Sequence, residues 1–383
     1  MQTTDLSDAV VARLASLGPG GPPVLSLYLD LDPSTVPTPR ERSAELSALL
    51  DRLTKDALGE AAGFSRDERA ALRGDIERLR GLLDGDDGVT KGAHGLAVFC
   101  SGAAGLLEVL RLPHQVEPAA SVERSPRLLP LLAQLAADRW GVVLVSRRAA
   151  RILRGDRDRL VEVADFRDDV HRRHQQGGWS QARYQRGIVK EVHDHSKRAA
   201  AALLAESKRR PLDHLVVGCS DELWPELQAD LHPYLRERVR GRIELDVERS
   251  TPDQVLDEVA AVIAATEEGR EREALERLGT GLGQSGHGAA GLDEVLVALD
   301  EHRVSLLLLA PGARFSGAAC PRCGWLSASA GSCPMDDSPL EQTEALAERA
   351  AQAALRDGAE LLLVRHRGGE LAERGSIGAL LRY

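Results

Sequence analysis

Apolar residues follow two kinds of pattern along this chain, and together these patterns predict a mixed α/β protein. Apolar residues at three- and four-residue intervals predict amphipathic helices, and short apolar runs between turn-forming residues predict strands. The predicted strands lie at 24–31, 95–100, 105–112, 140–146, 149–153, 160–164, 214–219, 243–247, 304–309 and 361–364. The predicted helices lie at 4–18, 39–58, 65–83, 128–138, 180–210, 220–231, 251–278, 292–299 and 342–357.

Turn-rich stretches divide the 383 residues into three predicted α/β domains, at 1–125, 126–250 and 251–383. Asp30 and Asp32 follow the first predicted strand, and we expect them to form the turn that ends it. The glycine-rich stretch 279–286 follows a helix and lacks the Gly-Lys-Ser/Thr ending of a phosphate loop. We therefore expect a flexible linker there.

The central domain carries a long predicted helix directly after a Gly-Gly pair. Gly177 and Gly178 allow close approach of the backbone to another surface, and Ser180 suits the N-cap. One face of the helix is apolar, with Ile188, Val192, Ala199 and Leu203. Another face is basic, with Arg183, Arg186, Lys190 and Lys197.

Charge sets this segment apart from the rest of the chain. Residues 171–210 hold ten Lys and Arg against three Asp and Glu, whereas the whole chain has a formal net charge of −10. A positive strip on an acidic protein suits a phosphate backbone. A solvated helix after a flexible loop would also explain the charges. A tip with Trp179 and glutamines between basic flanks favours contact with RNA over a mere connector.

The composition narrows the class of protein. Apolar residues make up 43% and charged residues 28%, which is typical of a soluble globular protein. The first residues do not form a signal-peptide pattern, and no apolar run reaches the length of a membrane span. Five cysteines, three of them clustered, suit a metal site in a reducing compartment. We expect a cytoplasmic protein without a membrane partner or an organic cofactor.

The clustered cysteines predict a metal-binding turn in the third domain. Cys320 and Cys323 have the Cys-x2-Cys spacing of a zinc knuckle. Cys333 begins the second half, where Asp336 stands in place of a fourth cysteine and Asp337 is the alternative ligand. A structural Cys3Asp zinc site and a ribbon that has lost its metal both fit this pattern.

Two motifs resemble one known family. The stretch Gly177-Gly178-Trp179-Ser180-Gln181-Ala182-Arg183-Tyr184 is similar to the Gly-Gly-Gln signature of archaeo-eukaryotic peptide release factors, with Trp179 in place of their glutamine. It is more similar still to their bacterial relatives, including the Vms-type peptidyl-tRNA hydrolases of ribosome rescue. The C-terminal stretch 375–383 resembles the Gly-Gly-Ile-Gly-Ala-Ile-Leu-Arg-Tyr ending of the same family. The resemblance covers residues 140–383 and implies three α/β domains in a release-factor-like arrangement.

The resemblance implies ester hydrolysis of peptidyl-tRNA at the peptidyl-transferase centre of the large ribosomal subunit. It implies no stop-codon reading, because the first domain lacks an Asn-Ile-Lys-Ser tetrapeptide. Gln181 would orient the attacking water, and the backbones of Gly177 and Gly178 would approach the tRNA terminus. Trp179 would stack on a base. The phosphate-binding residues would be Arg172, Arg173, Arg183, Arg186, Lys190 and Lys197.

Two other functions fit the same residues. Bacterial relatives of this fold include hibernation factors, which occupy the A site of idle ribosomes without a catalytic glutamine, and Trp179 favours that class. A small-molecule enzyme on the α/β scaffold is the third candidate, although no second polar cluster in the sequence supports it. A translational GTPase is a further expected partner.

Overall fold

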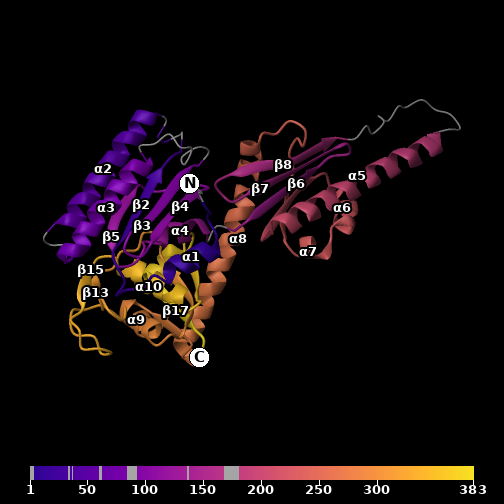
Figure 1. The fold of residues 1–383 in the computed structure, drawn as a ribbon. Helices are drawn as coiled ribbons and strands as arrows, with labels where there is room; N and C mark the ends of the chain where they lie inside the picture. The colour runs from indigo at the N-terminus through magenta and orange to yellow at the C-terminus, as the bar shows by residue number, and fades with distance from the viewer. Residues whose placement is uncertain are drawn as a thin grey trace. The chain divides into compact units, whose positions relative to one another are not determined.

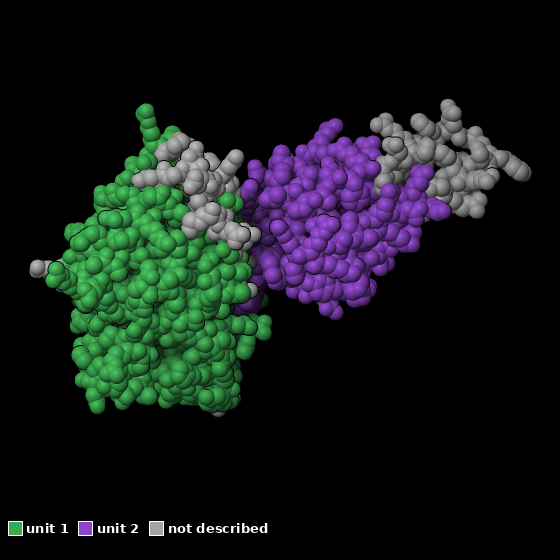
Figure 2. Space-filling view, viewed as in Figure 1, with its two compact units in different colours: residues 1–136, 271–383 green, residues 137–270 purple. Residues whose placement is uncertain are grey.

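The computed structural model describes residues 4–32, 35–36, 38–59, 63–83, 93–135, 138–167 and 181–383. They form a mixed α/β protein with several sheets, as the apolar patterns predict (Figure 1). The chain divides into two compact units (Figure 2): unit 1 contains residues 1–136 and 271–383, and unit 2 contains residues 137–270. Unit 1 thus combines segments assigned to the first and third predicted domains. The boundaries at 125 and 250 stay a prediction.

The first sheet of unit 1 has the strand order β1-β4-β3-β2-β5. Its strands are β1 (Thr4–Asp5), β2 (Val24–Asp30), β3 (Gly95–Ser101), β4 (Leu106–Leu112) and β5 (Ala119–Glu123). The helices around it are α1 (Asp8–Ala15), α2 (Pro39–Leu58), α3 (Arg66–Leu83) and α4 (Leu129–Leu135). β2 is buried on both faces: Leu25, Leu27 and Leu29 join the core of α2 and α3, while Val24 and Tyr28 join a second core.

Two smaller sheets form the C-terminal part of unit 1, with the orders β11-β17-β12-β16 and β14-β13-β15. Their strands are β11 (Gly288–Ala290), β12 (Val304–Leu309), β13 (Gly317–Ala319), β14 (Leu326–Ser327), β15 (Glu341–Thr343), β16 (Glu360–Leu363) and β17 (Ile377–Leu381). The accompanying helices are α9 (Leu292–Asp300), α10 (Leu346–Arg356) and α11 (Gly368–Ala372).

One core joins the two parts of unit 1. It contains Leu14 of α1 and Phe99 of β3 together with Leu307 of β12 and Ala350 of α10. Glu348 of α10 strengthens the junction, because its Oε1 accepts from the backbone N–H groups of Leu128 at 2.5 Å and Leu129 at 3.1 Å. The carboxyl group of one part thereby caps helix α4 of the other.

Burial raises the pKa of Glu348 to about 7, although the N–H groups of Leu128 and Leu129 lower it. The folded carboxyl therefore holds a proton more tightly than its unfolded counterpart at 4.5. The stability that this protonation confers is complete below pH 4.5 and is lost as the pH rises through about 7, a change of about 3 kcal/mol. Compared with Glu348→Gln, the wild type should therefore lose free energy of unfolding over this range.

The measurement is urea unfolding of wild type and Glu348→Gln between pH 4.5 and 8. Glu344→Gln, an exposed position just before α10, is the matched control and should follow the wild type. If the free energies of unfolding of wild type and Glu348→Gln change in parallel with pH, Glu348 has the same pKa in the folded and unfolded protein, and the prediction is wrong.

Unit 2 is a sheet between two helical layers, with the strand order β10-β9-β6-β7-β8. Its strands are β6 (Trp140–Val145), β7 (Ala149–Gly155), β8 (Leu160–Arg167), β9 (His214–Cys219) and β10 (Val239–Ile243). Its helices are α5 (Gln181–Arg209), α6 (Trp224–Asp230), α7 (Pro233–Arg236) and the first part of α8 (Pro252–Thr280). Val143 and Val145 of β6 pack with α5 and α6, and Val142 and Leu144 pack with α8.

One sequence prediction in unit 2 and one in unit 1 are wrong. The strand predicted at 243–247 lies at Val239–Ile243, because parallel pairing with β9 places Val239 opposite Leu215. It ends before Asp246, whose Oδ1 accepts from the backbone N–H of Glu248 at 3.0 Å and forms a turn. The predicted flexible linker at 279–286 is instead largely helical, because α8 runs on into a π-helical turn, η2 (Gly281–Ser285).

Asp30 has the structural role expected of it, and Cys100 belongs to the core. Asp30 Oδ1 accepts from the backbone N–H of Asp32 at 3.0 Å, and Oδ2 accepts from the hydroxyl of Thr35 at 2.6 Å, so the aspartates form a strand-ending turn. Cys100 is fully buried in the core, and burial raises the pKa of its thiol to about 12.

Candidate nucleic-acid interface and candidate metal centre

Helix α5 positions the described part of the predicted basic stripe. Ala199 and Leu203 are fully buried against the sheet of unit 2, as the apolar spacing predicts. Their burial turns the opposite face outward, so Lys190 and Lys197 are exposed. Both ammonium groups are therefore accessible to a phosphate. His193, between them in the sequence, is hydrogen-bonded to Glu226 of α6.

The remaining predicted site residues are placed only in part. The backbone of Gln181, Arg183 and Arg186 lies in the first two turns of α5, which confirms that the helix begins there. Their side chains lie outside the described residues. The predictions for Arg172, Arg173, Gly177, Gly178 and Trp179 also fall on residues outside those described.

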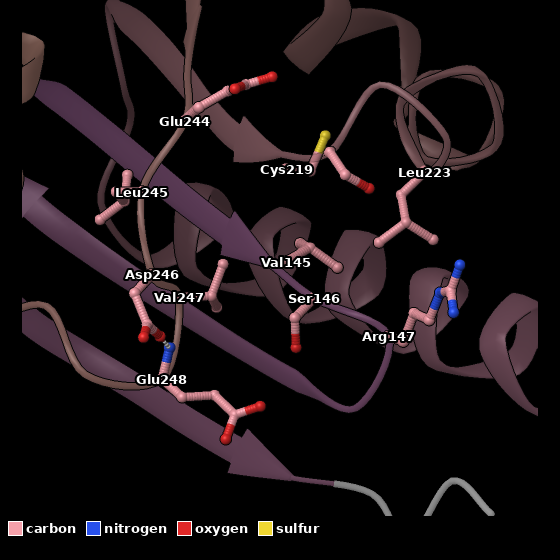
Figure 3. A pocket seen from close by; sticks show the side chains of 11 residues that line it. Val145, Ser146, Arg147, Cys219, Leu223, Glu244, Leu245, Asp246, Val247 and Glu248 are labelled. Carbon is pink, nitrogen blue, oxygen red and sulfur yellow. Dashed lines mark hydrogen bonds between the residues drawn. The ribbon is translucent and has the colours of Figure 1, made fainter. Parts of the chain in front are cut away.

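A cavity of about 390 Å³ lies at the ends of β6 and β9 (Figure 3), and the sequence patterns did not reveal it. The cavity is lined by residues at the ends of these two strands, by residues that directly follow them and by the segment after β10. Ser146, Ser220 and Asp246 are among its polar residues. The Ser146 hydroxyl accepts from the backbone N–H of Ala149 at 3.0 Å, and Glu248 pairs with Arg148 at 2.9 Å. These polar groups hold local turns, and no nucleophile–base pair occurs among the described residues that line the cavity.

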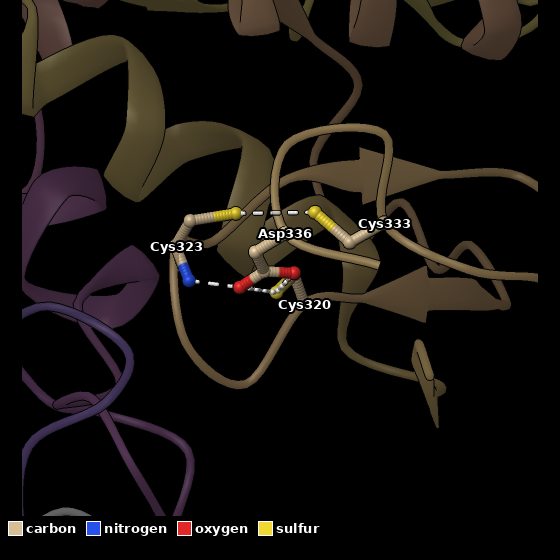
Figure 4. A group of neighbouring side chains, drawn as sticks. All are labelled: Cys320, Cys323, Cys333 and Asp336. Carbon is tan, nitrogen blue, oxygen red and sulfur yellow. Dashed lines mark hydrogen bonds between the residues drawn. The ribbon is translucent and has the colours of Figure 1, made fainter. Parts of the chain in front are cut away.

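The predicted metal ligands converge in the ribbon of β13, β14 and β15 (Figure 4). The sulfur atoms of Cys323 and Cys333 are 3.4 Å apart, and Cys320 Sγ lies 3.7 Å from both carboxylate oxygens of Asp336. A tetrahedral Zn²⁺ ion needs about 3.8 Å between two thiolates and about 3.5 Å between a thiolate and a carboxylate oxygen. These two separations are within about 0.4 Å of the required values, and all four ligand atoms lie within 4.8 Å of one another, so they are close enough to surround a single ion.

Asp336, and not its alternative Asp337, is brought to the three thiols. Asp337 is exposed and adopts a left-handed conformation, with φ of 55°, which ends the turn. Backbone N–H groups also point at the sulfur atoms, from Arg322 to Cys320 at 3.4 Å and from Met335 to Cys333 at 3.4 Å. Such donors stabilise thiolates, so the residues present fit a divalent ion of the zinc type.

The electrostatics of the cluster favour one thiolate. Burial tends to raise the pKa of Cys320, but the backbone N–H of Cys323 and the hydroxyl of Ser338 bring this pKa down to about 7. Burial and the neighbouring groups raise the pKa of Cys333 to about 12. The hydroxyl of Ser338 holds the pKa of Asp336 at about 2. A bound cation would reverse the unfavourable ionisation of Cys333, because a coordinated thiol loses its proton.

The knuckle packs against an N-terminal loop of unit 1. Gly20, at φ of 89°, lies so close to the Arg322 carbonyl that a Cβ there would be 3.0 Å from it. At Gly324, with φ of 86°, a Cβ would be 2.7 Å from Cγ of Pro19. Both glycines combine positive φ with close approach, so the knuckle and this loop support each other.

Residues 126–264 match a family model described as bacterial archaeo-eukaryotic release factor family 10. Over this segment the chain is release-factor-like. The match confirms the family resemblance seen in the Gly-Gly motif, and the matched segment contains α5 with Lys190 and Lys197. The narrower assignment to the Vms-type hydrolases stays a prediction. No curated protein matches the sequence.

Three solved structures illustrate what the chain is similar to. The archaeal translation termination factor aRF1 is 17% identical over 99% of both chains, with a TM-score of 0.28. S. cerevisiae Dom34, described as a translation termination-like factor interacting with Hbs1, is 13% identical over 73% of this chain and 74% of its own, with a TM-score of 0.43. Archaeal Pelota, from a model of ribosome-bound Pelota and ABCE1, is 13% identical over 72% of each chain, with a TM-score of 0.40.

None of the described helices is both long enough and apolar enough to cross a bilayer.

Proposed function

We propose that this chain is a ribosome-associated translation factor of the rescue type, which hydrolyses peptidyl-tRNA without reading a stop codon. The observation that carries the proposal is the family match over residues 126–264, which includes the Gly-Gly motif and α5. The exposed ammonium groups of Lys190 and Lys197 add support, because they extend a basic segment beyond that motif. We place the protein in the cytoplasm, where ribosomes are found.

The proposed reaction is attack of water on the ester carbonyl of peptidyl-tRNA in the peptidyl-transferase centre. Gln181 would orient this water through its amide, which donates and accepts hydrogen bonds and stays neutral beside phosphates. Gly177 and Gly178 would bring backbone N–H groups to the terminal adenosine, and Trp179 would stack on a base. The cations that would bind RNA phosphates are Arg172, Arg173, Arg183, Arg186, Lys190 and Lys197.

A non-catalytic factor that occupies the A site of idle ribosomes is the second candidate. Trp179 favours it, because this residue stands where release factors carry their glutamine. Both candidates require binding to the large subunit, and they differ only in peptide release. A translational GTPase is a proposed further partner. We also propose that Cys320, Cys323, Cys333 and Asp336 hold a structural Zn²⁺ ion, which would supply no chemistry to the reaction.

Binding is tested by sedimenting the protein with purified 50S subunits and 70S ribosomes at increasing salt. We expect co-sedimentation at low salt that weakens as salt rises, because phosphate contacts release counterions. The double variant Lys190→Glu, Lys197→Glu should bind on the order of tenfold more weakly. Its control is Arg272→Glu, Arg277→Glu, which reverses two exposed charges on α8 and should bind like the wild type. Absence of the protein from both particles at low salt would contradict both candidates.

A further inference from the structure

A second basic surface lies at the edge of the unit 2 sheet where β6, β9 and β10 begin. β6 pairs in parallel with β9, and β9 with β10, so their first residues share this edge. β7 is antiparallel and ends there, with Gly155 opposite Trp140. Helix α5 also ends there, directly before β9. We call this the strand-start surface, formed by Arg139, Arg154, Lys208, Arg209, Arg210, Arg236, Arg238 and Arg240.

Two of these arginines build the surface. Arg154 Nη1 and Nη2 donate to the carbonyls of Glu206 and Pro211 at 3.1 and 3.3 Å. Arg238 Nε donates to the carbonyl of Leu212 at 2.9 Å, and its guanidinium carbon lies 3.6 Å from the centre of the Tyr234 ring. These contacts tie the end of α5, the start of β9 and the corner before β10 into one rigid surface.

Positive charge exceeds negative charge on this surface. Asp213 pairs with Arg139 and Glu206 pairs with Arg209, each at 2.8 Å, and Glu237 is a third carboxylate. Asp156 and Asp158 follow the end of β7 and are matched in number by Arg157 and Arg159 beside them. Asp138 lies beside Arg139 and pairs with Arg270 at 3.1 Å. Lys208, Arg210 and Arg236 are exposed, and none of the three forms an ion pair with another described residue. The excess of positive charge also affects Arg154. Burial lowers the pKa of its guanidinium, Glu206 raises this pKa, and the charges of Arg210 and Arg139 lower it further.

We propose that the strand-start surface binds the phosphate backbone of RNA, as a second ribosome contact at the opposite end of α5 from the Gly-Gly motif. This inference rests on the proposed function, because the ribosome would supply the RNA. α5 has 29 residues and is therefore about 43 Å long, several times the Debye length in physiological salt, so the two contacts act independently. The Arg238 guanidinium already stacks on the ring of Tyr234. Because binding through this surface would rest on phosphate contacts, it should be independent of base sequence.

An acidic protein partner would use the same charges, and the test must separate the two. Lys208→Gln, Arg210→Gln, Arg236→Gln removes the three unneutralised charges and leaves Arg154 and Arg238 in place. The matched control is Lys55→Gln, Arg272→Gln, Arg277→Gln, which removes the same charge from exposed, dispersed positions on α2 and α8. The probes are a fluorescein-labelled single-stranded oligouridine, the same probe as an RNA duplex, and purified 50S subunits.

Wild type and control should bind all three probes with an affinity that falls steeply with salt. The strand-start variant should bind on the order of 10-fold to 100-fold more weakly, and its logarithmic salt slope should be smaller by about 2 to 3. Equal affinity and equal slope for variant and control on every probe would overturn the inference, and would leave an acidic protein as the occupant. At saturating protein concentration, peptide release should not depend on the strand-start surface. If the wild-type protein releases no peptide, that result therefore counts against the proposed function and not against RNA binding by this surface.

Discussion

Replacing Gln181 with alanine is expected to slow peptide release on the order of 100-fold, while ribosome binding stays within about twofold of wild type. The expected loss is large because the amide would act on the attacking water in the transition state. A truncated side chain cannot orient that water, and bulk water in its place lacks the fixed geometry. The basic residues of α5 are unchanged, so the energy of binding is retained.

The matched control is Gln185→Ala, one helical turn further along α5. It removes the same amide from the same helix and should release peptide at the wild-type rate. Release is measured from 50S subunits carrying labelled peptidyl-tRNA, with binding measured on the same particles. If Gln181→Ala and Gln185→Ala release equally fast, Gln181 has no part in the mechanism.

Loss of the metal site is expected to have the second-largest effect. Structural Zn²⁺ sites contribute on the order of 10 kcal/mol to the fold they organise at neutral pH. The short ribbon of β13, β14 and β15 has few apolar residues of its own, and its buried side chains include those of Ala318, Leu326, Cys320 and Cys333. We therefore expect one zinc ion per chain, and unfolding of the ribbon when Cys320 or Cys333 is replaced by alanine.

The fourth ligand allows a sharper comparison. Asp336→Asn removes the anionic ligand and should weaken zinc binding by at least on the order of 10-fold to 100-fold. Asp337→Asn is the matched control, because asparagine tolerates the left-handed conformation of that residue. Zinc content and thermal unfolding of both variants are compared with wild type. Protein without zinc after purification in zinc-replete medium, together with identical unfolding of the two variants, would contradict the metal site.

The local patterns predicted much of the secondary structure and the metal cluster. The Cys320–Cys323 spacing is set by one tight turn, so two ligands could be inferred without knowledge of the fold. The extent of α5 was predicted well, because Ala199 and Leu203 repeat at the helical period. The α/β class could also be predicted from local apolar patterns, because helices and strands alternate along the chain.

Features that depend on distant pairing could not be predicted. β10 was placed four residues late because its position depends on pairing with β9 and not on its own apolar pattern. The core shared by Phe99 and Leu307 joins segments far apart in sequence. The strand-start surface was missed for the same reason: Arg139, Arg154, Arg210 and Arg238 are scattered in sequence and meet only after the parallel strands pair.

The central claim is most directly tested by adding wild-type protein to 50S subunits that carry peptidyl-tRNA with a labelled nascent peptide. The proposed function predicts release of the labelled peptide, in amounts that grow with protein concentration and depend on Gln181. Stable binding to these particles without release would contradict the hydrolase and favour the non-catalytic factor.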